Sequence, residues 1–180
     1  MAVLAGWRFC PRCRGELLDG DGRVRCPACG FVMWANPAPT ACALVEDDEG
    51  RLLLVRRARD PFLGCWDLPG GFLHEDEHPL DALRRELVEE TGLEIEPGEF
   101  FGAWIDTYEQ RFALNLFWRA RVLGGEARPA DDVSELGWFA RGGLPARAEI
   151  AFAQVPRVLD AWLAADPGCN VRPEPPSSAR

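Results

Sequence analysis

Three glutamates lie close together in the middle of the chain: Glu86, Glu89 and Glu90. Their spacing of i, i+3 and i+4 puts all three side chains on one face if the segment is helical. Like charges on one face repel, so the cluster gains stability only when cations neutralise it. Carboxylate oxygens are hard ligands that suit Mg²⁺ or Mn²⁺. The alternative is a solvated acidic face, which is the usual explanation for such a cluster taken alone.

A second set of possible metal ligands lies near the start of the chain, in two CxxC pairs. The four residues are Cys10, Cys13, Cys26 and Cys29. Two such pairs bring four thiolates to the corners of a tetrahedron, which is the geometry of a closed, structural zinc site. Gly15 and Gly30 follow the two pairs and permit tight turns. We therefore predict a zinc ribbon whose folding free energy comes from the metal.

Two other uses of these cysteines are considered. A redox CxxC pair is disfavoured because the motif is duplicated, and disulfides are disfavoured because no export signal is recognisable. A ribbon can also contact a partner or nucleic acid. The five arginines and three acids from Met1 to Val32 make a small positive excess and not a basic groove, so we expect a structural role.

The composition bounds the remaining possibilities. The chain has 180 residues, of which 47% are hydrophobic and 27% are charged, which indicates one main core and a small additional module. A net charge of −9 argues against non-specific binding to nucleic-acid phosphates, so nucleic acid is not an expected partner. No apolar run approaches the roughly 20 residues of a membrane span, and we expect a cytoplasmic location without membrane association.

The pattern of apolar residues and turns predicts a mixed sheet with helices on both sides. Predicted strands cover 40–46, 51–57, 99–108 and 111–122, with a shorter one near Trp138, and the first two form a hairpin. A helix is predicted from Pro79 to Thr91, where Pro79 suits the first position and Gly92 can end the helix in a left-handed conformation. A last helix contains Val155, Val158 and Trp162, and Pro156 is expected to bend or restart it.

The segment Gly71–Leu93 carries a longer motif around the acidic cluster. Its residues match every fixed position of the Nudix box, GX5EX7REUXEEXGU with U aliphatic, so the chain resembles the Nudix hydrolase family. The resemblance implies an α/β/α sandwich. We predict a zinc ribbon over residues 1–36, a Nudix domain over 37–166 and a flexible tail over 167–180.

The resemblance also implies roles for individual residues. Glu86 and Glu90 would bind Mg²⁺ or Mn²⁺, with Glu89 as a third carboxylate and the backbone carbonyl of Gly70 as a further ligand. Glu77 would be an outer acid and Arg85 its ion-pair partner. An acid further along the chain often serves as an extra ligand or general base. The candidates are Glu126, Asp131, Asp132 and Glu135, and Asp132 is ranked marginally first.

The resemblance points to a class of substrate. A zinc ribbon before a Nudix domain is similar to the NADH pyrophosphatases, but their SQPWPxPxS stretch is replaced here by EFFGAWIDTYEQRFALN. The segments GFVMWANPAPT and CWDLPGGFLHEDE look closer to ribbon-bearing proteins that act on ADP-ribose and FAD. We therefore expect a Mg-dependent pyrophosphohydrolase that acts on a small nucleotide of the ADP-ribose, FAD or NADH type.

Two alternatives stay open. Tyr108 lies sixteen residues after Gly92, where some dinucleoside polyphosphate hydrolases of this family have a tyrosine. A non-catalytic module that senses nucleotides or binds a partner is the other alternative. The nearby aromatic residues could stack a base or fill the core: they are Phe100, Phe101, Trp104 and Trp118. Many relatives are dimers, which leaves a homodimer open.

Overall fold

The computed structural model describes residues 3–109 and 111–165. The strands are β1 (Leu18–Gly20), β2 (Arg23–Arg25), β3 (Val32–Trp34), β4 (Ala38–Glu46), β5 (Leu52–Arg57), β6 (Trp66–Asp67), β7 (Gly70–Phe72), β8 (Leu93–Tyr108), β9 (Arg111–Gly125) and β10 (Val133–Phe139). The helices are α1 (Pro79–Thr91), α2 (Gln154–Ala164) and the short 3-10 helix η1 (Arg147–Glu149). The tail predicted over 167–180 lies outside the described residues.

The chain forms two compact units. Of the described residues, one unit contains 3–38 with 107–109 and 111–113, and the other contains 39–106 with 114–165. Strands β1, β2 and β3 form an antiparallel sheet in the first unit. No helix in the described ranges is long and apolar enough to cross a membrane.

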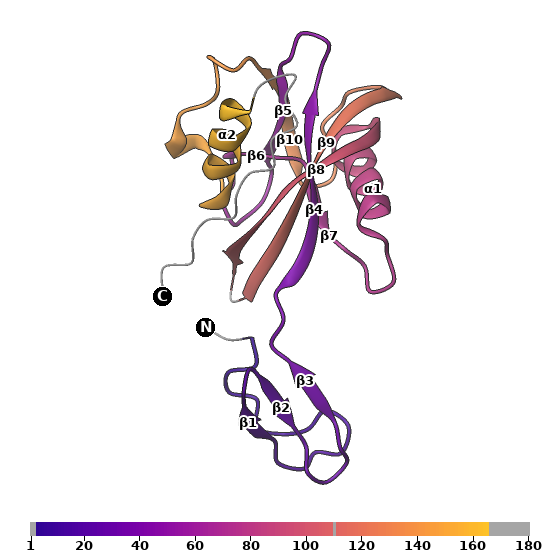
Figure 1. Ribbon diagram of the computed structural model, residues 1–180, viewed down its shortest axis with the longest axis vertical. Helices are drawn as coiled ribbons and strands as arrows, with labels where there is room; N and C mark the ends of the chain where they lie inside the picture. Colours follow the sequence, from indigo (N-terminus) through magenta and orange to yellow (C-terminus); the bar gives the residue numbers. More distant parts are fainter. Residues whose placement is uncertain (1–2, 110, 166–180) are drawn as a thin grey trace. The chain divides into compact units, whose positions relative to one another are not determined.

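The second unit is built on one mixed sheet. Its strand order is β10-β5-β4-β9-β8, with β6 paired to β5 and β7 paired to β4. Helix α1 covers one face of this sheet and α2 the other (Figure 1). The predicted hairpin is confirmed, because Glu46 of β4 pairs antiparallel with Leu52 of β5. The observed architecture is the predicted α/β/α sandwich.

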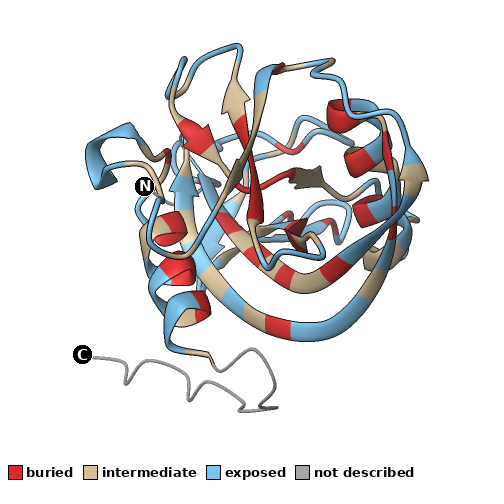
Figure 2. Ribbon diagram, turned by 90° about the horizontal axis from the view of Figure 1, so that it is seen from above, coloured by how far each residue is buried: buried red, intermediate tan, exposed pale blue. Residues whose placement is uncertain are grey.

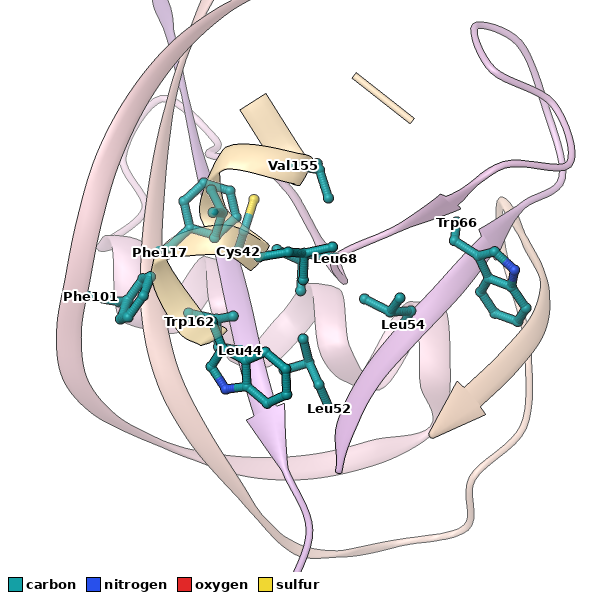
Figure 3. Close-up of a cluster of buried hydrophobic side chains, with 12 residues drawn as sticks. Cys42, Leu44, Leu52, Leu54, Trp66, Leu68, Phe101, Phe117, Val155 and Trp162 are labelled. Atoms are coloured by element: carbon teal, nitrogen blue, oxygen red, sulfur yellow. The ribbon is translucent and has the colours of Figure 1, made fainter. Parts of the chain in front are cut away.

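The alternating side chains of β4 supply both halves of the core. Ala43 and Val45 belong to the cluster beneath α1, while Cys42 and Leu44 belong to the cluster beneath α2. The second cluster includes Trp162 of α2 and is shown in Figure 3. Successive strand residues point to opposite faces, so the apolar run from Ala41 to Val45 is what a sheet covered on both sides requires.

Helix α1 has the predicted bounds, which follow from local signals. Pro79 is its first residue, and the ring of His78 accepts a hydrogen bond from the Leu80 amide at 3.3 Å. Gly92 ends the helix with φ of 69°, a left-handed conformation that favours glycine. Leu83 and Leu87 are fully buried against the sheet and leave the acidic side of the helix free for the site.

Helix α2 begins at Gln154, so Pro156 lies in its first turn. Proline is tolerated there because the first amides of a helix have no partner within it. Pro156 was expected to bend or restart the helix, and the helix in fact starts two residues before it. Along both helices buried residues recur between exposed ones (Figure 2). Trp162 of α2 donates a hydrogen bond from Nε1 to Glu46 at 3.0 Å.

Candidate functional site

The site is built around two consecutive glycines in β7. Gly70 pairs with Cys42 of β4 and has a φ of 139°, where a Cβ would lie 2.2 Å from the carbonyl oxygen of Ala41. Only glycine fits there. Its amide donates a hydrogen bond to Glu90 Oε2 at 2.9 Å, and Glu90 is a buried carboxylate with 7% of its surface exposed. The strand and the end of α1 are thus joined at a metal-ligand candidate.

The second glycine makes room for Glu86. A Cβ on Gly71 would lie 2.4 Å from the carboxylate carbon of Glu86 and 2.5 and 2.6 Å from its two oxygens. The Glu86 carboxylate therefore occupies the space that any larger residue at position 71 would fill. The backbone of β7 sets the position of this acid as closely as α1 does.

Arg85 organises the acids around it. Its Nε and Nη2 donate to the two oxygens of Glu77, both at 2.8 Å, in a bidentate ion pair. Its Nη1 donates to Glu86 at 2.7 Å and to Glu89 at 3.0 Å. The hydrogen bonds from Arg85 lower the pKa of Glu77 to about 2, and the His74 amide adds to this effect. The predicted pairing of Glu77 with Arg85 is present in the structure.

The two carboxylates beside the glycines have the opposite electrostatic environment. Burial raises the pKa of Glu90 well above 4.5, although the Gly70 hydrogen bond acts against this. Burial also raises the pKa of Glu86, and Arg85 opposes that shift. The charge of Asp132 raises the pKa of both acids, Glu89 adds to the rise at Glu86, and Glu86 adds to the rise at Glu90. Two buried acids of this kind carry full negative charge at low cost only when a cation lies beside them.

The three helix glutamates are not equivalent. Glu86 and Glu90 are largely buried, whereas the Glu89 side chain is 50% exposed and held by Arg85. Among the described residues, carboxylates do not gather into a group of three whose oxygens lie within 4.8 Å of one another. The donor chemistry nevertheless fits Mg²⁺ or Mn²⁺, because Glu90 contacts Gly70 and Glu86 contacts the adjacent Gly71, and both offer hard carboxylate oxygens.

Asp132 is the downstream acid whose charge acts on both acids of this cluster. The chain returns to the end of α1, where the Ala130 amide donates to the Glu90 carbonyl at 3.0 Å. The Asp132 side chain is 16% exposed, bonded to Arg59 at 2.8 Å, and it raises the pKa values of both Glu86 and Glu90.

The other three downstream acids are placed less favourably. Asp131 and Glu135 are 55% and 51% exposed, and Glu135 is paired with Arg56. The backbone of Glu126 lies against Gly92, at the end of the helix. Spacing alone left these acids nearly equal, and the fold favours Asp132.

The sequence analysis missed a further acid, Asp67 of β6. Burial raises its pKa to about 7, while Arg57, whose Nη1 lies 3.5 Å away, acts in the opposite direction. Asp67 also raises the pKa of Glu90. A carboxylate inside the apolar stretch CWDLPGG was the available signal, since acids are seldom buried without a reason.

The aromatic residues of β8 and β9 divide between the two predicted uses. Phe101 is buried in the cluster beneath α2, and Trp104 stacks on it with 5.9 Å between ring centroids. Trp118 packs partly against the other cluster, while Phe100 is 50% exposed beside it. The core explanation holds for Phe101, and only Phe100 presents a largely free ring. Tyr108 ends β8, and its proposed contact with substrate stays a prediction.

The four cysteines meet in the first unit. Their sulfur atoms all lie within 4.8 Å of one another, with Cys10 and Cys29 at 3.6 Å and Cys13 and Cys26 at 3.5 Å. A tetrahedral site with Zn–S bonds of about 2.3 Å has sulfur atoms about 3.8 Å apart. The four thiols therefore fit a zinc ion.

The two cysteine knuckles have matching backbones, which corrects one expectation. The Arg14 amide bonds to the Cys10 carbonyl as the Gly30 amide bonds to that of Cys26. The left-handed residue of the first knuckle is Arg14, with φ of 61°, rather than Gly15, and Gly30 has φ of 74° in the second. In both knuckles the turn requires a left-handed conformation at the residue directly after the second cysteine, whatever the type of that residue.

Comparison with known proteins identifies the family of this chain. A family model described as the NUDIX domain matches residues 36–162. The chain is similar to a crystal structure of a NUDIX hydrolase from Nitrosomonas europaea, with a TM-score of 0.74 and 26% identity over 87% of this chain and 90% of that one. The chain therefore belongs to the Nudix family and is a hydrolase that acts on acid anhydrides of phosphorus.

Two curated relatives indicate the chemistry of the subgroup. An ADP-ribose pyrophosphatase from Methanocaldococcus jannaschii is 32% identical over 117 residues, which are 64% of this chain and 69% of the relative. An NAD-capped RNA hydrolase from Pseudomonas aeruginosa is 28% identical over 141 residues, 77% of this chain but 49% of the relative. The relatives support hydrolysis of a compound linked to a nucleoside diphosphate.

Proposed function

We propose that this chain is a magnesium-dependent pyrophosphohydrolase that cleaves the diphosphate bond of a nucleotide of the ADP-ribose, FAD or NADH type. The observation that carries the proposal is the placement of two buried glutamates, Glu86 and Glu90, against Gly70 and Gly71. Hydrolase relatives named for NAD-capped RNA extend the proposed class to a nucleotide diphosphate at the end of an RNA.

The proposed cation site consists of Glu86 and Glu90, with Glu89 and the carbonyl of Gly70 as further ligands. A bound Mg²⁺ would offset the charge of the diphosphate and lower the pKa of a water molecule. Arg85 holds Glu86 in place and is itself fixed by Glu77 through two hydrogen bonds. Removal of Glu77 should therefore act on the reaction through Arg85 rather than by direct contact with substrate.

We propose Asp132 as the additional acid of the site. It is the downstream carboxylate whose charge acts on both Glu86 and Glu90. Its side chain is 16% exposed at the edge of the cluster, and an ion pair with Arg59 favours the carboxylate form that binds a cation.

The remaining assignments belong to the same proposal. The four-cysteine site would hold zinc, the ribbon would cover residues 1–36, and the hydrolase domain would cover 37–166. We infer a cytoplasmic enzyme with a small nucleotide as its substrate, and homodimerisation is a prediction that sedimentation would test.

The test is a substrate screen with purified protein and Mg²⁺. The compounds are ADP-ribose, FAD, NADH and a dinucleoside polyphosphate, and product analysis would identify the bond cleaved. Glu86→Gln and Glu90→Gln should each abolish turnover. Glu75→Gln removes an exposed acid of the same segment and should retain wild-type rates.

Two outcomes would reject the proposal. Wild-type rates in both the Glu86 and Glu90 variants would remove these residues from the reaction. Tight nucleotide binding without hydrolysis of any compound would instead support the non-catalytic sensing module.

A further inference from the structure

One face of the three-stranded sheet in the first unit carries a set of side chains that metal binding does not use. The register pairs Arg23 with Trp34 and Arg25 with Val32, and it pairs Leu18 with Arg25. Because strand residues alternate between faces, these five residues share one face. Val24, between the two arginines, points the other way and is buried with 1% of its surface exposed.

This face is apolar and accessible. Trp34 is 50% exposed, Leu18 is 46% exposed and Val32 is 44% exposed. Large apolar residues that share an exposed face mark an interaction surface more often than single exposed residues do. The exposed apolar side chains of this face are therefore accessible to a binding partner.

The charges of the face are of one sign. Arg23 and Arg25 are its ionisable residues, and no acid stands on this side of the three strands. Within the described part of the chain neither arginine forms an ion pair. Residues 1–38 hold five arginines and three acids, a net charge of +2, whereas the whole chain carries −9. The face that carries Arg23 and Arg25 is therefore positively charged although the net charge of the whole chain is negative.

The arrangement of Arg23 and Trp34 suits a particular ligand. The guanidinium carbon lies 4.7 Å from the centroid of the Trp34 ring, so a planar cation and an indole are stacked at the surface. Proteins that bind single-stranded nucleic acid use such platforms, in which bases stack on aromatic rings or guanidinium planes and arginines meet the phosphates. An acidic peptide would use the arginines but has no need of the indole.

We propose that this face, formed by Leu18, Arg23, Arg25, Val32 and Trp34, binds an unpaired stretch of RNA. The choice of RNA rests on the proposed function, since a nucleotide diphosphate at an RNA end would bring the following nucleotides to the same protein. Base stacking on Trp34 and phosphate pairing with the two arginines give binding without sequence preference.

Binding is measured with the full-length protein and a fluorescently labelled 12-nucleotide oligouridylate that lacks any diphosphate. Fluorescence anisotropy at 0.15 M salt should show saturable binding, and Trp34→Ala should weaken it about tenfold, the effect of losing one stacked base. Arg23→Gln/Arg25→Gln should reduce the slope of log affinity against log salt by about 1.4, because two phosphate contacts are lost.

Matched variants separate the face from general charge and surface effects. Arg84→Gln/Arg121→Gln makes the same change in net charge at two exposed arginines of the second unit and should leave the RNA affinity unchanged. Leu123→Ala, at a residue 61% exposed, is the apolar control. Zinc content and ADP-ribose hydrolysis should be equal in all variants, which shows that fold and catalysis are intact.

Several results would overturn the proposal. They are no binding of the oligouridylate at 0.15 M salt, equal binding by wild type and Trp34→Ala, or preference for a duplex RNA of the same length. Preference for the deoxy oligonucleotide or for polyglutamate would assign the face to another partner. Because the probe contains no diphosphate, these results do not depend on whether the hydrolase proposal is correct.

Discussion

Gly71→Ala is expected to disable hydrolysis while leaving the fold in place. The backbone at Gly71 is not left-handed, so alanine is sterically allowed there. The new Cβ would lie 2.4 Å from the Glu86 carboxylate carbon, whereas ordinary contacts begin at 3.4 Å, so the carboxylate must retreat by 1.0 Å. A displacement of about 1 Å in a catalytic group costs about 100-fold in rate, or about 3 kcal/mol of transition-state stabilisation.

The assay is the Mg²⁺-dependent rate on the best compound of the substrate screen, together with the melting temperature. We expect the rate of Gly71→Ala to fall about 100-fold and its melting temperature to change little, because the end of a long side chain moves more easily than backbone. Gly70→Ala should instead lower stability, since its Cβ would meet the Ala41 backbone.

Gly142→Ala is the control for glycine replacement, because a Cβ there meets nothing within 4 Å. A Gly71→Ala protein with wild-type rate and wild-type Mg²⁺ dependence would refute the placement of Glu86 in the site. A large fall in melting temperature together with the loss of rate would show that position 71 matters only for folding.

Three further predictions follow from burial and charge. Burial raises the Asp67 pKa from 3.8 to about 7, so between these pH values the folded protein binds more protons than the unfolded chain and loses stability as the pH rises. Asp67→Asn removes this effect, so the stability of the variant relative to wild type, measured by urea unfolding without divalent cations, should rise from pH 4 to pH 8. A constant stability difference over this range would contradict the assignment. Leu83→Ala in α1 should destabilise the protein by about 3 kcal/mol in the same unfolding assay, because Leu83 is fully buried, and a loss below about 1 kcal/mol would mean that this core is loosely packed. Cys26→Ser should abolish zinc binding, measured by metal analysis, while hydrolysis continues; one zinc per chain retained in the variant would exclude the four-sulfur site.

The sequence alone determined the features that depend on nearby residues. Pro79 and Gly92 set the bounds of α1, because helix ends are governed by which residues tolerate the first turn and the left-handed exit. The spacing of the two CxxC pairs predicted the cluster of four cysteines for a similar reason, since each pair folds into its own turn. The glutamate spacing placed the three acids on one helix face.

Local patterns predicted other elements less well. Strand β8 begins at Leu93, six residues before the predicted start, because Leu93 and Ile95 are buried beneath α1 although Glu94 lies between them. The short strands β6 and β7 were not predicted, since two or three residues show no periodicity. Their pairing with β5 and β4 is what defines them.

Only the tertiary structure decided where the acids lie relative to one another. The fold brings the Gly70 amide to Glu90, twenty residues away, and places the Glu86 carboxylate in the space left by the missing Cβ of Gly71. It also returns Asp132 to the cluster and buries Asp67 beside it. Such contacts join distant parts of the chain through backbone pairing and packing, and no local pattern of residue types records which distant groups will meet.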